Sequence, residues 1–492
     1  MTTMQSTAFA TPPTVAPRQS APATSSCRAL YDTLSQADLP AGADADAQAY
    51  LVGQLARAAS HPCDLPDSPA GLDGWIAPRG AAIGVQYQHY LAARRDGAPR
   101  RFFSSKAHAL YFLRCVAPTK LVDGAWLYST LRRWQENDFR PLLKTYVEEL
   151  GDGLPDKNHV TLYQRLLDNH GCADWNDLGG AHFTQGAIQL ALAYAGEDFL
   201  PEMIGYNLGY EQLPLHLLIT AYELNELGID PYYFTLHITV DNGSTGHARD
   251  AVDALQRVMA RAADPAEFYR RVREGYKLNE LGENTGSVIA SFDLEQELVR
   301  ILAAKAVVGQ NMHSDYCRVA GKTINAWLAD PVQIPTLLRA FETTGWIKRG
   351  AAPHESRFWS LLQGDHAEMF GVFSSYEQQV LADWIASPAN EGDPAAATPR
   401  VASFRARQRA QAPARNAAPK AHGARALIRY PYAGKAGEHE AENDQLRRLE
   451  QAVALAPSTA GAMKLLIAHM SPARHHTPTG LMATRMFVRL LG

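Results

Sequence analysis

Hydrophobic residues recur at helical spacing through the middle of this chain. Between about residues 102 and 387, apolar side chains return every three or four positions, as in Leu127, Leu131 and Trp134. Residues at this spacing share one face of a helix. Gly and Pro separate the apolar runs as they do at helix ends. Few segments alternate between apolar and polar residues, and the run from Tyr232 to Val240 most resembles a β-strand. The pattern therefore predicts an all-α fold with a helical bundle over residues 102–387.

The segments on either side differ from this bundle in composition. Residues 1–27 are rich in Thr, Ser, Ala and Pro and contain almost nothing to bury, so we expect them to be disordered. Residues 28–101 predict an N-terminal helical extension, which a Pro-rich run interrupts. Residues 388–425 form an Ala/Pro/Arg-rich linker, and residues 426–492 predict a C-terminal helical segment that the linker tethers. The total of 492 residues also favours two or three domains.

Charge and cysteine content narrow the classes of function. Lys and Arg number 47 and Asp and Glu 51, and this near-balance argues against a chain held to nucleic acid by phosphate neutralisation. No stretch reaches the roughly 18 apolar residues of a membrane helix, and the N-terminus has no secretory pattern. The five cysteines are far apart and form no CxxC pair. This spacing suits a reducing compartment, so we expect a cytoplasmic protein.

Candidate chemistry begins at Glu149. His159 follows ten residues later, and Gly151, Gly153 and Pro155 between them make one continuous helix unfavourable. The chain can turn back there and bring His159 beside Glu149. A glutamate near a helix end and a histidine in the next loop are also common surface residues, so this pair alone leaves both interpretations open.

Glu211 is the next candidate. It lies in the run Tyr206-Asn207-Leu208-Gly209-Tyr210-Glu211, where a carboxylate among aromatic residues is rare unless it is paired or coordinates a metal. Because Pro214 follows, Glu211 can instead be an exposed residue in the first turn of a helix, where the helix dipole favours a negative charge.

The strongest element is the run from Phe234 to His247. His237 and Asp241 lie four apart and share one face of a helix. His247 joins them if the glycine-rich insert Asn242-Gly243-Ser244-Thr245-Gly246 distorts the helix. Two imidazoles and a carboxylate suit a transition metal with nitrogen and oxygen ligands, although core histidines bonded to backbone are the alternative. In order along the chain, these Glu, His and Asp residues match what a di-iron carboxylate site in a helical bundle requires.

The same residues carry a resemblance to a known family. The run GDGLPDKNHVTLYQRLL after Glu149, the run YNLGYE and the run YFTLHITVDNGSTGHA resemble the iron-containing redox enzymes with a heme-oxygenase-like fold, which are di-iron oxidases and oxygenases. The resemblance covers roughly residues 102–387 and implies a heme-oxygenase-like helical bundle. Carried over residue by residue, it implies the metal ligands Glu149, His159, Glu211, His237, Asp241 and His247. Because the insert displaces His247, it leaves open whether His237, His247 or both bind iron.

The resemblance also implies the reaction class. We expect a non-heme oxidoreductase with two Fe(II) ions per chain and O₂ as co-substrate, acting on a small organic molecule, with no catalytic residues assigned beyond the metal ligands. N-oxygenation of an amine is favoured over oxidative C–C cleavage or desaturation of a fatty or amino acid. Expected partners are the substrate, an electron donor and a second copy in a homodimer, without membrane or nucleic acid.

An alternative of another class is a non-enzymatic helical binding module. The segment from Arg400 to Arg425 is basic and has no acidic residue, so it can dock an acidic partner or be a solvated linker. Metal content separates the two readings: about two irons per chain favour the enzyme.

Overall fold

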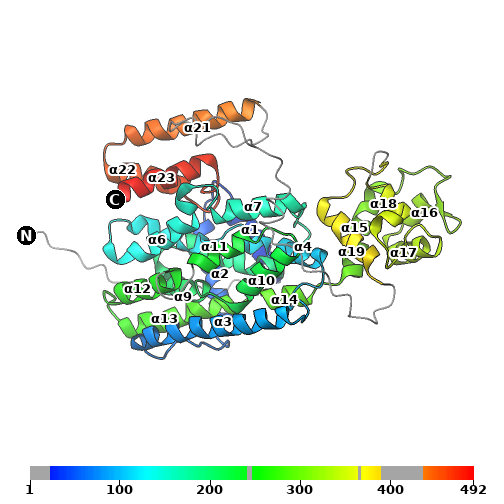
Figure 1. Cartoon of the computed structure of the whole chain (residues 1–492). Helices are drawn as coiled ribbons and strands as arrows, with labels where there is room; N and C mark the ends of the chain where they lie inside the picture. Colours follow the sequence, from blue (N-terminus) through cyan, green and yellow to red (C-terminus); the bar gives the residue numbers. More distant parts are fainter. Residues whose placement is uncertain (1–22, 241–245, 364–366, 389–435) are drawn as a thin grey trace, which may run out of the picture.

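The computed structural model describes residues 23–240, 246–363, 367–388 and 436–492 (Figure 1). Over these residues nearly all regular structure is helical, and the strands described are one short antiparallel pair, β1 (Arg318–Val319) and β2 (Lys322–Thr323). The prediction of an all-α fold is therefore confirmed. Among the helices described, none is both long enough and apolar enough to cross a membrane.

Three of the helices described precede the central bundle. They are α1 (Ala23–Leu34), α2 (Ala43–Ala58) and α3 (Leu72–Arg95), with the 3₁₀ turn η1 (Pro69–Gly71) before α3. In α2 the buried residues Ala43, Ala47 and Leu51 recur every four positions, and α2 packs against α8. The predicted disordered segment extended to residue 27, but residues 23–27 begin α1. Cys27 is buried there, with its Sγ 3.2 Å from the Tyr50 hydroxyl.

The central bundle follows, from residue 106 to residue 280. Its helices are α4 (Lys106–Cys115), α5 (Ala117–Lys120), α6 (Arg140–Glu149), α7 (His159–His170), α8 (Thr184–Tyr194), α9 (Leu200–Tyr210), α10 (Leu215–Glu226), α11 (Tyr232–Val240), α12 (His247–Met259) and α13 (Pro265–Lys277). Its 3₁₀ turns are η2 (Ala125–Arg133), η3 (Asn137–Phe139), η4 (Gly151–Gly153), η5 (Gly180–Phe183), η6 (Glu197–Phe199) and η7 (Leu278–Glu280). The closest packing joins α9 and α13, where a Cβ on Gly205 would lie 1.9 Å from the Val272 carbonyl oxygen. Glycine thus lets the two backbones touch.

The run from Tyr232 to Val240 is a helix although its residues favour a strand. Tyr233, Phe234 and His237 are buried, and this i, i+1, i+4 spacing is helical. β-propensity mainly reflects how side chains fit a pleated surface, and here packing in a helical bundle overrides it.

A second group of helices forms a lobe beside the main body (Figure 1). After α14 (Thr285–Ala290), it contains α15 (Leu294–Gly309), α16 (Ile324–Leu328), α17 (Ile334–Thr343), α18 (Arg357–Ser360) and α19 (Ser375–Ala386), with the 3₁₀ turns η8 (Pro331–Gln333) and η9 (Pro353–Glu355). The lobe joins the bundle at α4, where the Ala107 amide donates a hydrogen bond of 2.7 Å to Asp383 Oδ2.

The C-terminal helices pack onto the main body. They are α21 (Ala436–Ala454), α22 (Thr459–His469) and α23 (Pro478–Leu491), which lie together along one side of the main body (Figure 1). Helix α23 packs against η4. Met463, Leu466 and Phe487 are fully buried in the same apolar cluster as α6, α8 and α9. The predicted basic linker lies outside the described residues apart from Pro388, so the division of the chain into domains remains a prediction.

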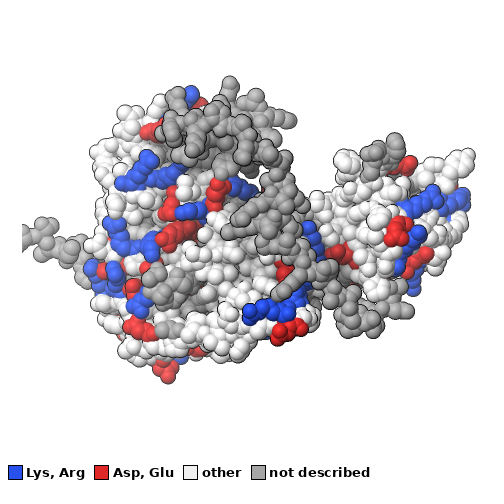
Figure 2. All heavy atoms as spheres, in the orientation of Figure 1, with Lys and Arg blue, Asp and Glu red and all other residues white. Residues whose placement is uncertain are grey.

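The buried apolar residues form two clusters, and the candidate site lies at the boundary between them. One includes residues of α6 and α12, and the other includes residues of α7 and α11. All four of these helices carry a predicted ligand, so the candidate site lies where the clusters meet. On the outer face seen in Figure 2, cationic and anionic side chains are interspersed, in keeping with the small net charge of −4.

Candidate metal centre

The candidate ligands are placed mostly at helix ends. Glu149 is the last residue of α6, His159 the first of α7 and His247 the first of α12, while Glu211 directly follows α9. Helix ends suit this role because the chain can change direction there and aim several elements at one point. His237 lies inside α11.

Glycines bring Glu149 and His159 together. The loop between them turns back at Gly151, whose φ of +64° is left-handed and whose added Cβ would lie 2.3 Å from the Asn158 amide nitrogen. His159 Nδ1 therefore lies 2.5 Å from Glu149 Oε2, as the glycine and proline pattern predicts. On the other side, a Cβ on Gly124 would lie 2.8 Å from Glu149 Cβ, so the turn that carries Asp123 presses directly against Glu149.

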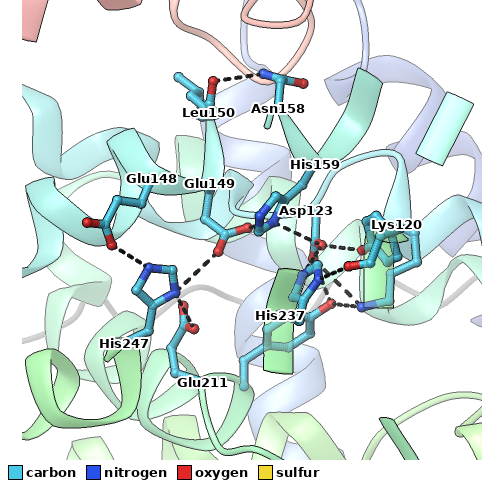
Figure 3. A network of polar contacts seen from close by, with 12 residues as sticks. Lys120, Asp123, Glu148, Glu149, Leu150, Asn158, His159, Glu211, His237 and His247 are labelled. Atoms are coloured by element: carbon cyan, nitrogen blue, oxygen red, sulfur yellow. Dashed lines mark hydrogen bonds and ion pairs between the residues drawn. The ribbon is translucent and has the colours of Figure 1, made fainter. Parts of the chain in front are cut away.

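One half of the site is built around Asp123. We call Asp123, His159 and His237, together with Glu149, the Asp123 half. Asp123 Oδ2 lies 3.1 Å from His237 Nε2 and 3.9 Å from His159 Nδ1, and the two imidazole rings are 4.2 Å apart between centroids (Figure 3). All four side chains are buried. The His237 Nδ1–H donates to the Tyr233 carbonyl oxygen at 2.9 Å, so this tautomer turns Nε2 toward the carboxylates.

Three further groups stabilise the Asp123 carboxylate. The Tyr233 hydroxyl donates to Oδ2 at 2.5 Å and the Tyr210 hydroxyl donates to Oδ1 at 2.9 Å. Lys120 Nζ lies 3.9 Å from Oδ1 and donates to the Tyr210 hydroxyl at 3.0 Å. Burial by itself would raise the pKa of Asp123, but Lys120 and the hydrogen bond with His237 hold that pKa below its ordinary value. Asp123 is therefore held as a carboxylate.

The other half of the site is built around His247. We call Glu211 and His247, together with Glu149, the Glu211 half. His247 Nδ1 lies 3.1 Å from Glu211 Oε2 and 3.4 Å from Glu149 Oε1. Its Nε2 lies 2.9 Å from Glu148 Oε2, so Nε2–H donates to Glu148 while Nδ1 faces the two buried carboxylates (Figure 3). Although partial burial raises the pKa of Glu148, the His247 hydrogen bond lowers it overall.

The two halves share Glu149, which lies between them (Figure 3). Asp123, Glu149, His159 and His237 each offer a ligand atom within 4.8 Å of the others, and so do Glu149, Glu211 and His247. Carboxylates are almost never buried without a positive partner, and three converge here. Imidazole nitrogens and carboxylate oxygens are ligands that suit iron, so this buried group of side chains could hold metal.

Five of the six predicted ligands are brought together. Glu149, His159, Glu211, His237 and His247 all belong to the two clusters, with His237 in one half and His247 in the other. Asp241 lies outside the described residues. Gly246 has an extended backbone and directly precedes α12, so the chain departs from a continuous helix just before His247, and residues 241–245 lie outside the described residues.

Sequence reasoning missed Asp123 and Glu148. Asp123 lies in the run Leu121-Val122-Asp123-Gly124, where an acidic residue after two apolar residues and before a glycine was the available signal. It is weak, because the same pattern marks many surface turns. Glu148 directly precedes Glu149. Both carboxylates reach His247 because α6 ends at Glu149, and the sequence pattern does not indicate this contact.

Comparison with known proteins agrees with the predicted resemblance. Residues 110–280 match the family model described as iron-containing redox enzyme, and this segment contains all the residues of both halves. The match supports an iron-dependent oxidoreductase with a heme-oxygenase-like all-α fold, and over this segment the predicted resemblance is confirmed. No curated protein and no solved structure matches the chain.

Proposed function

From the family match over residues 110–280, we propose that this chain is a non-heme di-iron oxidoreductase that uses O₂ to oxidise a small organic substrate. The observation that carries the proposal is the sharing of Glu149 between two buried carboxylate–imidazole clusters. A single mononuclear site would not require the second cluster, and a binding module would require neither.

The residues for each ion follow from the clusters. Asp123, Glu149, His159 and His237 would hold one iron, and Glu149, Glu211 and His247 would hold the other. Asp241 remains a predicted metal ligand. Two Fe(II) ions, when bound, would supply electrons for the reduction of O₂.

The chain's own residues orient the ligands and place protons. The Tyr233 carbonyl fixes the tautomer of His237, and Glu148 fixes that of His247. The Tyr210 hydroxyl donates a hydrogen bond to one oxygen of Asp123 and the Tyr233 hydroxyl donates to the other, so both hydroxyl protons point at this carboxylate. Glu148 has a side chain that is 34% exposed, so it can pass a proton between His247 Nε2 and solvent.

Within this function, N-oxygenation of an amine is the reaction we favour. Oxidative C–C cleavage or desaturation of a fatty or amino acid by the same site is the alternative. An electron donor and a second copy of the chain remain the expected partners.

Metal analysis and rapid mixing test the proposal together. After anaerobic loading with Fe(II), we expect about two irons per chain, as a bundle-core carboxylate site holds. Stopped-flow absorbance of the loaded protein with O₂ should then change faster with a substrate amine than with a fatty acid. Iron loading that equals that of a Glu149→Ala control would refute the enzyme and favour the helical binding module. A Soret band would indicate heme instead.

A further inference from the structure

The connection between Glu149 and His159 depends on one buried amide, that of Asn158. Its Oδ1 accepts from the Thr161 amide at 2.9 Å and so caps the start of α7, whose first residue is His159. Its Nδ2 donates to the Leu150 carbonyl oxygen at 3.2 Å and so closes the loop that follows Glu149 (Figure 3). The position of Asn158 therefore determines where His159 begins its helix relative to Glu149.

Asn158 has a further partner far away in the chain. Its Nδ2 also donates to His475 Nδ1 at 3.1 Å, and His475 lies in the turn between α22 and α23, 317 residues along the chain. Both side chains are buried, with exposed fractions of 0% and 2%. Because Nδ1 accepts this hydrogen bond, the His475 ring is neutral with its proton on Nε2.

The same C-terminal turn and helices hold the ligand loop at two other points. Before Glu149, the Tyr146 hydroxyl donates to the Met470 carbonyl oxygen at 2.6 Å. Within the loop, Gly153 lies under α23, and a Cβ on it would approach the Leu481 carbonyl oxygen to 2.2 Å. The C-terminal helices thus contact the chain both before Glu149 and between Glu149 and His159. Their residues, 459–491, lie outside the segment that matches the family model, residues 110–280.

We infer that His475 is a positioning residue of the metal site, which holds Asn158 and through it fixes His159 in the Asp123 half. The inference rests on the proposed function, because it assigns to His475 an effect on metal binding. The hydrogen bond of His475 goes to Asn158, which precedes the candidate ligand His159. It acts by limiting the orientations of the Asn158 amide, so α7 begins with His159 directed at Glu149.

Two substitutions at His475 separate positioning from packing. His475→Leu keeps a similar side-chain volume and removes the Nδ1 acceptor. His475→Asn places a carbonyl oxygen two bonds from Cβ, the same position that Nδ1 occupies in histidine, so it keeps an acceptor there. His476→Leu is the matched control, since His476 is the next residue and its Nδ1 has no hydrogen-bond partner among the described residues.

The experiment is a titration of the metal-free full chain with Co(II), followed by the visible absorption of the bound ion. Wild type should bind two Co(II) ions. In His475→Leu one of the two should bind about tenfold more weakly, the lower end of what loss of an outer partner causes. His475→Asn should restore most of this affinity, and His476→Leu should match wild type.

The outcomes distinguish this inference from the proposed function. Wild type that binds no Co(II) and no Fe(II) would refute the function itself. Two wild-type sites with unchanged affinities in His475→Leu would refute only the role of His475. If His475→Leu does not fold, Asn158→Ser breaks the same contact from the other side and keeps a capping oxygen for α7. It should weaken the same site, and unchanged affinity there overturns the inference equally.

Discussion

The two halves of the candidate centre hold similar ligands in different surroundings. In the Asp123 half, two tyrosine hydroxyls, a lysine and an imidazole surround one carboxylate. In the Glu211 half, the carboxylates of Glu149 and Glu211 lie beside one imidazole, that of His247, and a third carboxylate contacts this ring from outside the half. The first arrangement supplies protons and positive charge to a buried anion. The second brings negative charges together around a single ring.

This difference predicts how each half depends on metal. The Asp123 half is held by hydrogen bonds that exist without an ion, so its geometry is preorganised. The Glu211 half gains more from a cation, because converging carboxylates repel one another until positive charge arrives. We therefore expect the Asp123 half to bind its metal more tightly and the Glu211 half to bind its metal second.

The largest effect should come from the ligand that both halves share. Glu149→Ala removes one ligand from each cluster, so the iron bound per chain should fall from about two to less than one. Iron analysis after anaerobic loading and desalting measures this directly. Glu148→Ala, one residue away, should keep the iron of the Asp123 half. Equal iron content in the two variants would show that Glu149 is not shared.

The carboxylates of the two halves should have opposite effects on the stability of the metal-free protein. Asp123→Ala leaves the hydroxyls of Tyr210 and Tyr233 and the Lys120 charge without their buried partner, which should lower the free energy of unfolding by about 2–4 kcal/mol. Glu211→Ala removes one of several converging carboxylates, so the metal-free protein should be as stable as wild type or slightly more stable.

Urea unfolding of both variants in a chelator tests this contrast. Glu211→Ala should also bind about one iron per chain instead of two. Equal destabilisation by the two substitutions would mean that the surroundings of the halves do not differ in the way their contacts indicate.

A smaller effect should follow from Glu148, which contacts the Glu211 half from outside. Glu148→Gln keeps the size of the side chain and removes the carboxylate that accepts from His247 Nε2. Outer partners of this kind typically alter metal affinity 10–100-fold, so the second ion should bind at least about tenfold more weakly. Stepwise Co(II) titration separates the ions. If the first ion lost affinity instead, Glu148 would act on the Asp123 half, and its assignment to the Glu211 half would be wrong.

Sequence reasoning reached the Glu211 half and much of the Asp123 half for identifiable reasons. Gly151 and Gly153 predict the return of the chain between Glu149 and His159, and Gly246, the one residue of the glycine-rich insert within the described residues, has an extended backbone just before α12. Periodicity likewise predicts the helical fold. These signals are local, and each can be read within about twenty residues of chain.

Contacts between distant segments could not be predicted in this way. Asp123 becomes part of the site because Tyr210 and Tyr233, about 90 and 110 residues away, direct their hydroxyls to it. The strand-like residues of α11 become a helix through packing in the bundle. His475 reaches Asn158 only because the C-terminal helices fold back over η4, which the pattern of a charged helix after a linker does not indicate.

The smallest predicted effect concerns pH and uses His475 behind the Asp123 half. Burial, with a smaller contribution from His476, lowers the pKa of His475 well below its ordinary value. In the unfolded chain this imidazole takes up a proton near pH 6.5, whereas in the folded protein it stays neutral to a much lower pH. The unfolded state therefore binds more protons below about pH 6.5, and the stability that the neutral ring contributes is present above that pH and is lost as pH falls.

His475→Asn should remove this pH dependence while it keeps the hydrogen bond from Asn158. The free energy of unfolding of wild type should fall relative to that of the variant between about pH 6.5 and 5, by at most about 1.4 kcal/mol per pH unit. Urea unfolding of both proteins in a chelator at the two pH values gives the difference. A constant gap between them would mean that His475 titrates alike in the folded and unfolded chains. We expect the stability of wild type to fall relative to that of His475→Asn as pH decreases, while the variant binds Co(II) with an affinity close to that of wild type. The two results together would show that an acceptor atom positions the Asp123 half, and that a neutral imidazole is one group that can supply this acceptor.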